Sequence, residues 1–246
     1  MTANQTKVAI VTGASRGIGA AIAERLAKDG FTVVVNYAGS AAEAGDVVRK
    51  IEKAGGTAVT AQADVSKPED VRRMFQSAET AFGGIDVLVN NAGVMALSPI
   101  ADADDATFDR LTAINLKGSF NAMREAGQRL RSGGRIINFS TSVVGLKLEN
   151  YGIYAATKAA IEMMTGIMAK EMRGRSITVN AVAPGPVATE LFLHGKSDEL
   201  IDKMAKMNPM ERLGTPEDIA NVVSFLAGPD GAWINGQMLR ANGGMV

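Results

Sequence analysis

The chain has 246 residues, 46% of them hydrophobic, and its 26 basic and 26 acidic side chains balance to a formal net charge of zero. This length fits one large α/β domain, and because the charges are interspersed they give no electrostatic footprint for nucleic acid or an anionic membrane. The absence of cysteine excludes disulfides, thiolate metal sites and a cysteine nucleophile.

No segment has the pattern of a targeting signal or a membrane span. The N-terminus lacks the apolar core of a signal peptide, and no apolar run approaches the roughly 20 residues that a span needs. We therefore expect a cytoplasmic protein that has neither a membrane nor a nucleic acid as partner. No Pro/Ser-rich linker, charge block, low-complexity segment or internal repeat divides the chain, which predicts a single domain over residues 1–246.

Short apolar runs rich in β-branched residues alternate with longer amphipathic stretches along the chain. This alternation predicts repeated strand–helix–strand units, and hence an α/β fold with a seven-stranded parallel sheet and helices on both faces. Ligands of such sheets bind at the carboxyl ends of the strands, so the segments just after each run form the candidate site. The expected strands are Val8–Val11, Thr32–Val35, Thr57–Thr60, Ile85–Val89, Arg135–Phe139, Ile177–Val182 and Gln237–Arg240.

The first expected strand is followed at once by a glycine-rich turn, Thr12-Gly13-Ala14-Ser15-Arg16-Gly17-Ile18-Gly19, which opens a helix-like segment. A strand, a glycine turn and a helix N-terminus together form a site for a dinucleotide pyrophosphate, since the free N–H groups and macrodipole of the helix favour anions. One glycine permits the tight turn, one lets backbone approach the phosphates, and one lets the helix pack closely on the strand. The alternative is an ordinary turn, because the spacing Gly-x-x-x-Gly-x-Gly differs from the common dinucleotide fingerprint.

The second expected strand leads into Val35-Asn36-Tyr37-Ala38-Gly39-Ser40, and no Asp or Glu occurs between Gly30 and Ala42. An acid in this stretch would bind the ribose hydroxyls of NAD and repel a 2′-phosphate, so its absence favours NADPH, with NADH as a weaker cofactor. Arg16, helped by donors from Asn36 and Ser40, is placed to contact that phosphate. The alternative for Arg16 is a solvated turn residue, and the lack of a second basic residue here predicts a modest preference.

Polar residues also follow the third and fourth expected strands. Asp64 is placed to accept a hydrogen bond from the adenine amino group, or else to cap the helix that opens at Pro68. For Ser66 we favour the cap. The fourth strand is followed by Asn90-Asn91-Ala92-Gly93, where backbone passes close to the cofactor, although the amide of Asn90 is equally suited to holding neighbouring strand ends together.

The fifth expected strand ends in the hydroxyl-rich segment Ser140-Thr141-Ser142, and Tyr154-Ala155-Ala156-Thr157-Lys158 lies shortly downstream. Tyr154 and Lys158 are four residues apart, so on a helix they share one face and the ammonium lies near the phenol. A nearby cation favours tyrosinate and lowers a phenol pKa that is normally about 10, which suits a general acid/base at neutral pH. A lone Tyr-x-x-x-Lys is more often an exposed helical pair, but its place after a hydroxyl-rich strand end favours the catalytic interpretation.

These motifs, in this order, resemble those of the short-chain dehydrogenase/reductase family, and the resemblance covers nearly the whole chain from about Lys7. It implies a single-domain Rossmann fold. The matching positions are Thr12-Gly13-x-x-x-Gly17-x-Gly19, Asn90-Asn91-Ala92-Gly93, Asn115, Ser142, Tyr154-x-x-x-Lys158 and Pro184-Gly185-x-Val187-x-Thr189.

The resemblance implies a role for each matching catalytic side chain. Tyr154 is the expected general acid that protonates the carbonyl oxygen during reduction, and Ser142 the donor that polarises and orients it. Lys158 is expected to lower the tyrosine pKa and to bind the nicotinamide ribose, and Asn115 to hold a water in the proton relay. Hydride from NADPH then reduces a ketone or aldehyde, with no metal. The single histidine, His194, has no ligand partners at metal spacing and is expected at the surface.

The resemblance also implies cofactor contacts along the ends of the strands, with Val187 and Thr189 at the nicotinamide carboxamide and the phosphates. The expected contacts are Gly13, Ser15, Arg16, Gly17, Ile18, Gly19, Asn36, Tyr37, Ser40, Asp64, Val65, Asn91, Ala92, Gly93, Tyr154, Lys158, Pro184, Gly185, Val187 and Thr189. A homotetramer or dimer is implied as well, because the helical segments Ala103–Leu130 and Tyr154–Arg173 lie in regions that form subunit interfaces in the family.

The segment from about residue 190 to 211 stands where the family has a mobile lid over the active site. Its apolar residues suggest a medium-sized, fairly apolar ketone or aldehyde, because methionine adapts to varied apolar shapes. The alternative is that several of them are core or subunit contacts. The residues concerned are Leu191, Phe192, Leu193, Ile201, Met204, Met207 and Met210, with Met95, Val144 and Leu146 nearby.

Two segments, Arg212–Ala220 and Asn242–Met245, resemble the 3-oxoacyl-[acyl-carrier-protein] reductase subgroup, whose members dock an acidic carrier protein with basic residues. Arg175 matches one docking position, whereas Gly133 stands at the other. We therefore rank an NADPH-dependent reductase of small-molecule ketones or aldehydes first. The alternatives are a 3-oxoacyl reductase, which adds acyl carrier protein as a partner, a sugar or alcohol dehydrogenase, and, remotely, a non-catalytic nucleotide-sensing scaffold.

Overall fold

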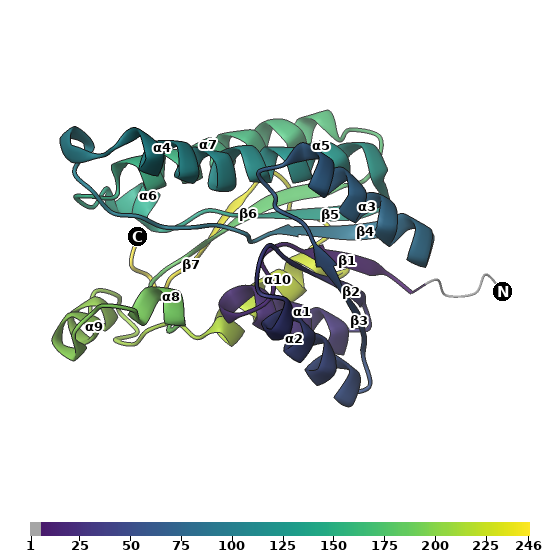
Figure 1. Cartoon of the computed structure of the whole chain (residues 1–246), viewed down its shortest axis with the longest axis horizontal. Coiled ribbons are helices and arrows are strands. Elements are labelled where there is room, and N and C mark those ends of the chain that lie inside the picture. Colours follow the sequence, from purple (N-terminus) through teal and green to yellow (C-terminus); the bar gives the residue numbers. More distant parts are fainter. Residues whose placement is uncertain (1–5) are drawn as a thin grey trace.

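The computed structural model describes residues 6–246, which fold as a single domain around a seven-stranded parallel sheet with helices on both faces (Figure 1). The strand order is β3-β2-β1-β4-β5-β6-β7, and every neighbouring pair is parallel. The strands are β1 (Val8–Val11), β2 (Thr32–Tyr37), β3 (Thr57–Gln62), β4 (Ile85–Asn90), β5 (Leu130–Phe139), β6 (Thr178–Pro184) and β7 (Met238–Ala241). The expected α/β fold is confirmed.

Helices connect the strands and form a layer on each face of the sheet. They are α1 (Gly17–Lys28), α2 (Ala41–Lys53), α3 (Pro68–Phe82), α4 (Asp105–Leu111), α5 (Ser119–Arg129), α6 (Val143–Leu146), α7 (Gly152–Glu171), α8 (Glu190–Leu193), α9 (Asp198–Ala205) and α10 (Pro216–Ala227). Helices α1, α2 and α10 pack on one face, and α3, α5 and α7 on the other (Figure 1). Within residues 6–246, no helix combines the length and apolar character needed to cross a membrane.

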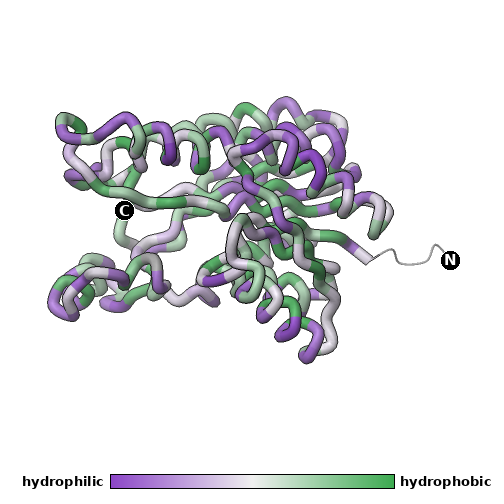
Figure 2. The backbone as a smooth tube through the Cα atoms, in the orientation of Figure 1, coloured by the Kyte–Doolittle hydropathy of each residue, from purple (hydrophilic) through white to green (hydrophobic). Residues whose placement is uncertain are grey.

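Alternate residues of the central strands point to opposite faces of the sheet and enter two separate hydrophobic clusters. On β1, Ala9 and Val11 join the cluster under α1, α2 and α10, whereas Val8 and Ile10 join the cluster under α3, α5 and α7. Both faces of these strands are therefore apolar, and green segments mark them between the helix layers in Figure 2. Burial on two faces explains why the strands stand out as nearly continuous apolar runs in the sequence.

The sheet has its switch point at β1 and β4, which pair with each other while the chain leaves them toward opposite edges. The connection after β1 leads to β2 on one side, and the connection after β4 leads to β5 on the other. Because these connections diverge, a crevice forms at the carboxyl ends of the two strands, where ligands of such sheets bind.

The helical segment expected over Ala103–Leu130 contains a π-helical stretch that the sequence pattern does not predict. It consists of α4, a π-helical stretch at Thr112–Gly118, and α5. The side chain of Asp104 caps α4 by accepting a hydrogen bond from the Thr107 N–H at 2.6 Å. Single-turn π-helical stretches are frequent at functional sites, and this one carries the buried Asn115.

Ser66 does not cap α3, so that expectation is wrong. Lys67 precedes the helix, and no side chain caps it. The N–H and the hydroxyl of Ser66 instead donate to Asp64 Oδ1 at 3.0 and 2.7 Å, and Asp70 accepts from the Asp64 N–H at 3.1 Å. Pro68 has no N–H that a cap could bind. The side chains of Ser66 and Asp70 therefore bind Asp64, in the loop before α3, in place of the helix N-terminus.

Candidate active site

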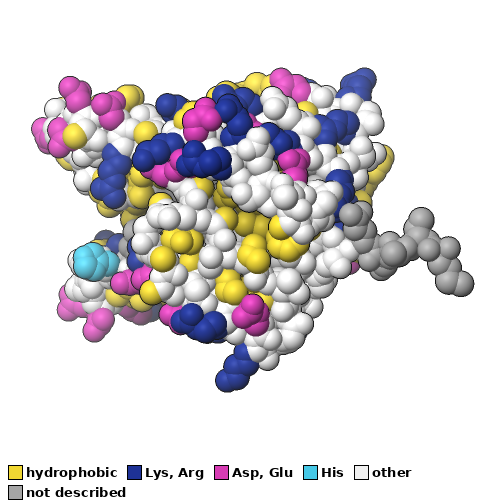
Figure 3. Space-filling view, turned by 45° about the vertical axis from the view of Figure 1, so that its right-hand side comes forward, with side chains coloured by type: hydrophobic (Ala, Val, Ile, Leu, Met, Phe, Trp, Pro, Cys, Tyr) yellow, Lys and Arg dark blue, Asp and Glu magenta, His cyan; other side chains and the backbone are white. Residues whose placement is uncertain are grey.

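A cavity of about 700 Å³ lies at the carboxyl ends of the strands, beside the switch point. In Figure 3 the left side of the molecule is hollowed between an upper and a lower projecting part. Every expected site residue lines the cavity except Tyr37, which packs on the core, and Asn115, which is buried beside Val94. The expected residues along the wall are Gly13, Ser15, Arg16, Gly17, Ile18, Gly19, Asn36, Ser40, Asp64, Val65, Asn91, Ala92, Gly93, Ser142, Tyr154, Lys158, Pro184, Gly185, Val187 and Thr189.

The glycine turn has the close contacts that only glycine permits. Gly13 has φ +62°, and a Cβ there would lie 2.9 Å from the Cα of Ala92. A Cβ on Gly19 would lie 2.4 Å from the Gly13 carbonyl oxygen and 2.5 Å from Asn91 Nδ2. Side chains at these positions would displace the turn. The first turn of α1 has no side-chain cap, and its residues Gly17, Ile18 and Gly19 line the cavity. This is the cradle that a pyrophosphate requires.

Asparagine amides fasten the turn to its neighbours. Asn36 is buried: its Oδ1 accepts from the Gly13 N–H at 3.1 Å, while Nδ2 donates to the carbonyls of Ala61 and Ala63 at 3.1 and 3.0 Å. Both amide hydrogens are therefore engaged, and Asn36 has none for a 2′-phosphate, which corrects the expected role. Asn91 likewise donates from Nδ2 to the carbonyl of Gly13 at 3.0 Å.

Asn90 has the structural role that the sequence left open. It is buried, and its Nδ2 donates to Asn138 Oδ1 on β5 at 2.9 Å. Asn138 in turn donates to Thr165 Oγ1 on α7 at 2.9 Å. This chain of hydrogen bonds ties β4 to β5 and β5 to the helix that carries the tyrosine and lysine.

Arg16 has an acidic neighbour, Glu43, that lies just outside the acid-free stretch between Gly30 and Ala42. Arg16 immediately precedes α1, its side chain is 63% exposed, and its Nη1 lies 3.5 Å from Glu43 Oε1. The stretch free of acids ends at Ala42, one residue short of Glu43, and the first turn of α2 brings that carboxylate to the guanidinium. A phosphate at this edge of the cavity would therefore meet Arg16 already engaged in an ion pair.

Tyr154 and Lys158 face the cavity from one side of α7, as their spacing predicts. Lys158 is 4% exposed, its Nζ donates to the Phe139 carbonyl at 3.0 Å, and burial lowers its pKa to about 8. Burial also raises the pKa of Tyr154 to about 12. The expected lowering of the tyrosine pKa by Lys158 is therefore not observed, because desolvation of the phenol dominates.

Asn115 and Lys158 lie on either side of Gly93. A Cβ on Gly93 would lie 3.3 Å from Asn115 Oδ1 and 3.4 Å from Lys158 Nζ. The Asn115 amide binds the backbone of Val94 twice, accepting from its N–H at 2.8 Å and donating to its carbonyl at 2.9 Å. Asn115 also donates to Thr157 Oγ1 on α7 at 3.4 Å, so it holds the segment after β4 against that helix. A side chain at Gly93 would be in tight contact with the amide.

Two hydroxyls follow β5 and have different surroundings. Ser142 is buried, and its Oγ accepts from Asn242 Nδ2 at 2.8 Å and donates to the Ala183 carbonyl at 3.3 Å. Thr141 is half-buried on the cavity wall, and its Oγ1 accepts from the Val143 N–H at 3.3 Å. Tyr151 also lines the cavity, with its ring edge-on to that of Tyr154 at 6.4 Å between centroids. The sequence interpretation assigned no role to Thr141, Tyr151 or Asn242.

The segment from 190 to 211 folds over the cavity as α8 and α9. Phe192, Met204 and Met207 line the wall from this side, and Leu146 and Met245 line it from others. Met210 is 62% exposed and does not take part, and the side chain of Leu191 lies outside the described residues. The cavity wall beyond the phenol is therefore largely apolar, as the sequence suggested.

The two remaining candidates lie away from the cavity wall. His194 is exposed after α8, and no group of three His, Cys, Asp or Glu suited to a metal occurs in the described part of the chain. The guanidinium of Arg175 donates to the carbonyls of Gly127 and Leu130, and its own carbonyl accepts from the Gly133 N–H. Arg175 thus fastens the start of β5, which weakens the case for it as a docking residue.

The chain matches a family model described as enoyl-(acyl carrier protein) reductase over residues 13–246. It is 46% identical over 250 residues to a short-chain type dehydrogenase/reductase of Picea abies, covering 98% of this chain and 92% of that protein. It is 47% identical over 255 residues to NADPH-dependent aldehyde reductase 2, chloroplastic, of Arabidopsis thaliana, covering 98% and 94%.

Solved structures agree with these matches. The angucycline C-6 ketoreductase LanV with bound NADP superposes with a TM-score of 0.92 at 38% identity, covering 98% of this chain and 96% of that one. The chain therefore belongs to the short-chain dehydrogenase/reductase family and is an oxidoreductase of that family.

Proposed function

We propose that this protein reduces the carbonyl of a ketone or aldehyde to an alcohol, with NADPH as hydride donor and Tyr154 as general acid. The observation that carries the proposal is the phenol of Tyr154, which faces the same cavity as the glycine turn and has a pKa raised to about 12. A phenol with this pKa keeps its proton at neutral pH, as a donor to a developing alkoxide must. Relatives named as an aldehyde reductase and a ketoreductase support the same direction of reaction.

The residues present fit a nicotinamide dinucleotide phosphate. The glycine turn and the first turn of α1 offer bare N–H groups for the pyrophosphate, and Gly93 leaves room for backbone approach. Val187 and Thr189, which follow β6, line the same cavity as Lys158, and they would hold the nicotinamide half. NADPH supplies a hydride to the carbonyl carbon. Arg16 favours NADPH, and NADH serves as the weaker cofactor.

The protein's own groups would position the carbonyl and supply its proton. The phenol of Tyr154 donates to the carbonyl oxygen while the hydroxyl of Ser142 orients it. The ammonium of Lys158 lies one helical turn away and favours the phenolate that remains. The apolar wall from Phe192, Met204 and Met207 excludes water and accepts a medium-sized, fairly apolar substrate. The 190–211 segment acts as a lid over that substrate.

Tyr154→Phe tests the mechanism, with NADPH oxidation measured against an apolar aryl ketone, an aldehyde, an acetoacetyl thioester and a sugar lactone. We expect the wild type to turn over the ketone or aldehyde and the variant to lose this activity while binding NADPH with nearly unchanged affinity. Full activity in Tyr154→Phe would refute the mechanism. Turnover confined to the thioester would favour the 3-oxoacyl reductase alternative instead.

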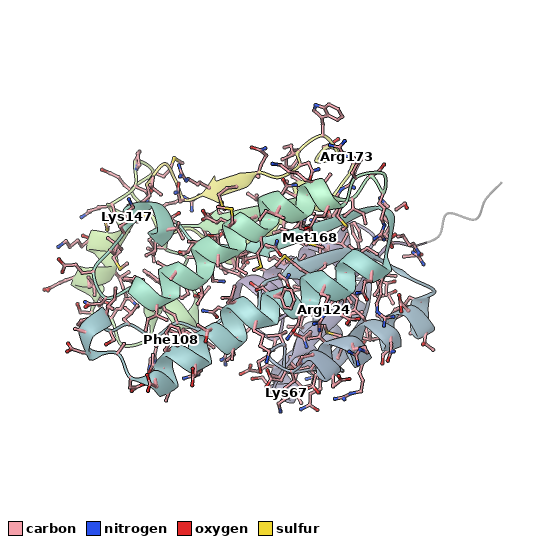
Figure 4. The ribbon with its side chains drawn as sticks, turned by 90° about the horizontal axis from the view of Figure 1, so that it is seen from above. Lys67, Phe108, Arg124, Lys147, Met168 and Arg173 are labelled. Carbon is pink, nitrogen blue, oxygen red and sulfur yellow. The ribbon has the colours of Figure 1, made fainter. Side chains whose placement is uncertain are left out.

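The assembly is also a proposal: we expect a homotetramer or dimer. Apolar side chains project from the outer helix layer, among them Phe120 at 44%, Ile167 at 50% and Met163 at 67% exposure. Figure 4 shows this layer from above, with Met168 between α5 and α7 and Phe108 on α4. A monomer mass in light scattering would contradict this. The cytoplasmic location stays a prediction, since a plant relative is named as chloroplastic.

A further inference from the structure

Tyr151 is a half-buried phenol on the cavity wall to which the proposed mechanism assigns no role. It lies just before α7, three residues ahead of Tyr154, and both side chains line the cavity. The two rings meet edge-on, with their centroids 6.4 Å apart and their planes at 62°. A substrate that binds at the phenol of Tyr154 is therefore close to the ring of Tyr151.

The backbone fixes the position of Tyr151 without using its hydroxyl. Asn150 has φ +68°, a left-handed conformation that asparagine tolerates, and its carbonyl accepts from the Ser98 N–H at 3.0 Å. Within residues 6–246, the hydrogen bonds of Tyr151 are those of its main chain. Its N–H donates to the Leu148 carbonyl at 3.4 Å, and its carbonyl accepts from the Ala155 N–H at 2.8 Å. The phenolic hydroxyl therefore has no partner in the described part of the chain, whereas a tyrosine hydroxyl packed in protein usually has one.

The neighbouring wall is largely apolar. Leu146 and Leu148 line the cavity from the segment that leads to Tyr151, and Phe192 lines it from α8. Burial raises the pKa of Tyr151, so the phenol keeps its hydrogen at neutral pH. An apolar pocket fixes the orientation of its ligand through a small number of polar groups. The hydroxyl of Tyr151 is such a group, because it can donate to an oxygen of the substrate or accept from a hydroxyl.

The rings of Tyr151 and Phe192 favour an aromatic substrate at this wall. Aromatic pairs in edge-to-face or offset arrangements gain free energy beyond the area that they bury. An aliphatic chain would bury apolar area against the same wall but would lack this additional gain. The wall thus suits an aromatic ring, and the free hydroxyl suits a polar group on that ring.

We propose that Tyr151 is a specificity-determining residue whose hydroxyl binds a second oxygen of the substrate, and that the preferred substrate is an aryl ketone or aldehyde with a hydroxyl or ether oxygen on its ring. The proposal rests on the proposed carbonyl reduction and deepens it by naming a substrate class. Tyr154 remains the source of the proton, and Tyr151 binds a part of the substrate that does not react.

The test uses acetophenone and its ortho-, meta- and para-hydroxy and methoxy derivatives as matched substrates. The wild type, Tyr151→Phe and Tyr37→Phe are compared by steady-state kcat and KM with NADPH and by their unfolding midpoints. Tyr151→Phe keeps the ring and removes only the hydroxyl. Tyr37→Phe is the matched control, because Tyr37 packs on the core and does not line the cavity.

The quantity compared is the ratio of kcat/KM for a substituted ketone to kcat/KM for acetophenone. A ring substituent also changes the reactivity of the carbonyl, but this effect is the same in every variant and cancels when the ratios are compared. For at least one ring position, the ratio in the wild type is expected to exceed that in Tyr151→Phe by about 2- to 10-fold, the usual effect of one neutral hydrogen bond. The change is expected mainly in KM, because the bond is present in both the ground state and the transition state.

The remaining measurements separate specificity from catalysis and folding. For acetophenone, which has no second oxygen, kcat/KM of Tyr151→Phe is expected to stay near the wild-type value, as is the unfolding midpoint. Tyr37→Phe is expected to show the wild-type ratios. Equal ratios in the wild type and Tyr151→Phe at every ring position would overturn the inference, and so would an equal change of the ratios in Tyr37→Phe.

The failure of this inference is distinguishable from that of the proposed function. A wild type that reduces no carbonyl refutes the proposed function, and this inference with it. A wild type that reduces aryl ketones, loses this activity on Tyr154→Phe and keeps its substrate ratios on Tyr151→Phe refutes the inference alone.

Discussion

Replacing Arg16 by alanine removes the guanidinium that we expect to contact the 2′-phosphate of NADPH. The side chain is 63% exposed and lies 3.5 Å from Glu43, so its interaction with a phosphate is screened by solvent and opposed by the carboxylate. A unit charge pair at about 4 Å gives about 1 kcal/mol in bulk water and about 4 kcal/mol near a protein surface. With this exposure we expect a value toward the lower limit, about 1–2 kcal/mol.

That free energy corresponds to NADPH binding that is weaker by about 5- to 30-fold in Arg16→Ala. NADH lacks the phosphate, so its dissociation constant is expected to change less than about twofold. Glu43→Gln frees Arg16 and removes a negative charge near the phosphate, and it is expected to tighten NADPH by about 2- to 5-fold. Both changes are expected to shrink as ionic strength rises.

Cofactor titration by fluorescence or calorimetry measures all three proteins with both cofactors at low and raised salt. Arg25→Ala is the matched control, because Arg25 lies on α1 and pairs with Asp29 away from the cavity wall. Equal weakening of NADPH and NADH in Arg16→Ala would show that Arg16 does not discriminate the phosphate. Unchanged or weaker NADPH binding in Glu43→Gln would refute the role given to the ion pair.

Three further outcomes follow from the site. Lys158→Met should abolish turnover yet raise the free energy of unfolding at neutral pH by about 1–2 kcal/mol in a denaturant titration. The pKa of Lys158 is lowered to about 8, so its burial cost is present below that pH and is relieved as pH rises toward 10.5. Gly19→Ala should lower stability by about 1–3 kcal/mol and weaken NADPH binding, because its Cβ meets Asn91 Nδ2 at 2.5 Å. Gly166→Ala, with nothing within 4 Å, should be neutral or stabilising in the same unfolding assay. The pKa of Tyr154 is raised to about 12, so the phenol keeps its proton for carbonyl reduction throughout the neutral range. The reverse reaction, alcohol oxidation, needs the phenolate, so its rate should increase steadily from about pH 6 to about pH 9. An oxidation rate that levels off near neutral pH would contradict this prediction.

The strands were predictable because both faces of this sheet are covered. Buried parallel strands lack the polar alternation of half-exposed ones, so β1 and β4 appear as short apolar runs between amphipathic stretches. The start of β5 was missed: the strand begins at Leu130, but Gly133 and Gly134 interrupt the apolar pattern before Arg135. The π-helical stretch at Thr112–Gly118 was missed as well, because its residues give an unbroken helical pattern.

The positions of the site residues were predictable to a large extent, whereas their electrostatics were not. The glycine turn and the Tyr-x-x-x-Lys spacing place their residues through local geometry alone, and that geometry holds here. The pKa of Tyr154 depends on burial by the surrounding segments, which spacing on one helix does not describe. The ion pair of Arg16 with Glu43 depends on how α1 and α2 pack, and no local rule places those two side chains together.

The same limit explains why the expected phosphate contact of Asn36 was wrong and why the buried partners of Ser142 were not predicted. Asn36 and Ser142 are polar residues at strand ends, where ligand contacts are expected, yet both donate to protein carbonyls. The Ser142 hydroxyl oxygen also accepts from the amide of Asn242. The partner of Ser142, Asn242, is 100 residues away in sequence. A residue's type and spacing place it at the cavity, but whether its donor is free depends on such distant partners. Because the bonds of Ser142 join the end of β5 to β6 and to Asn242 after β7, the packing of these three strands decides which polar groups at the cavity fasten the fold.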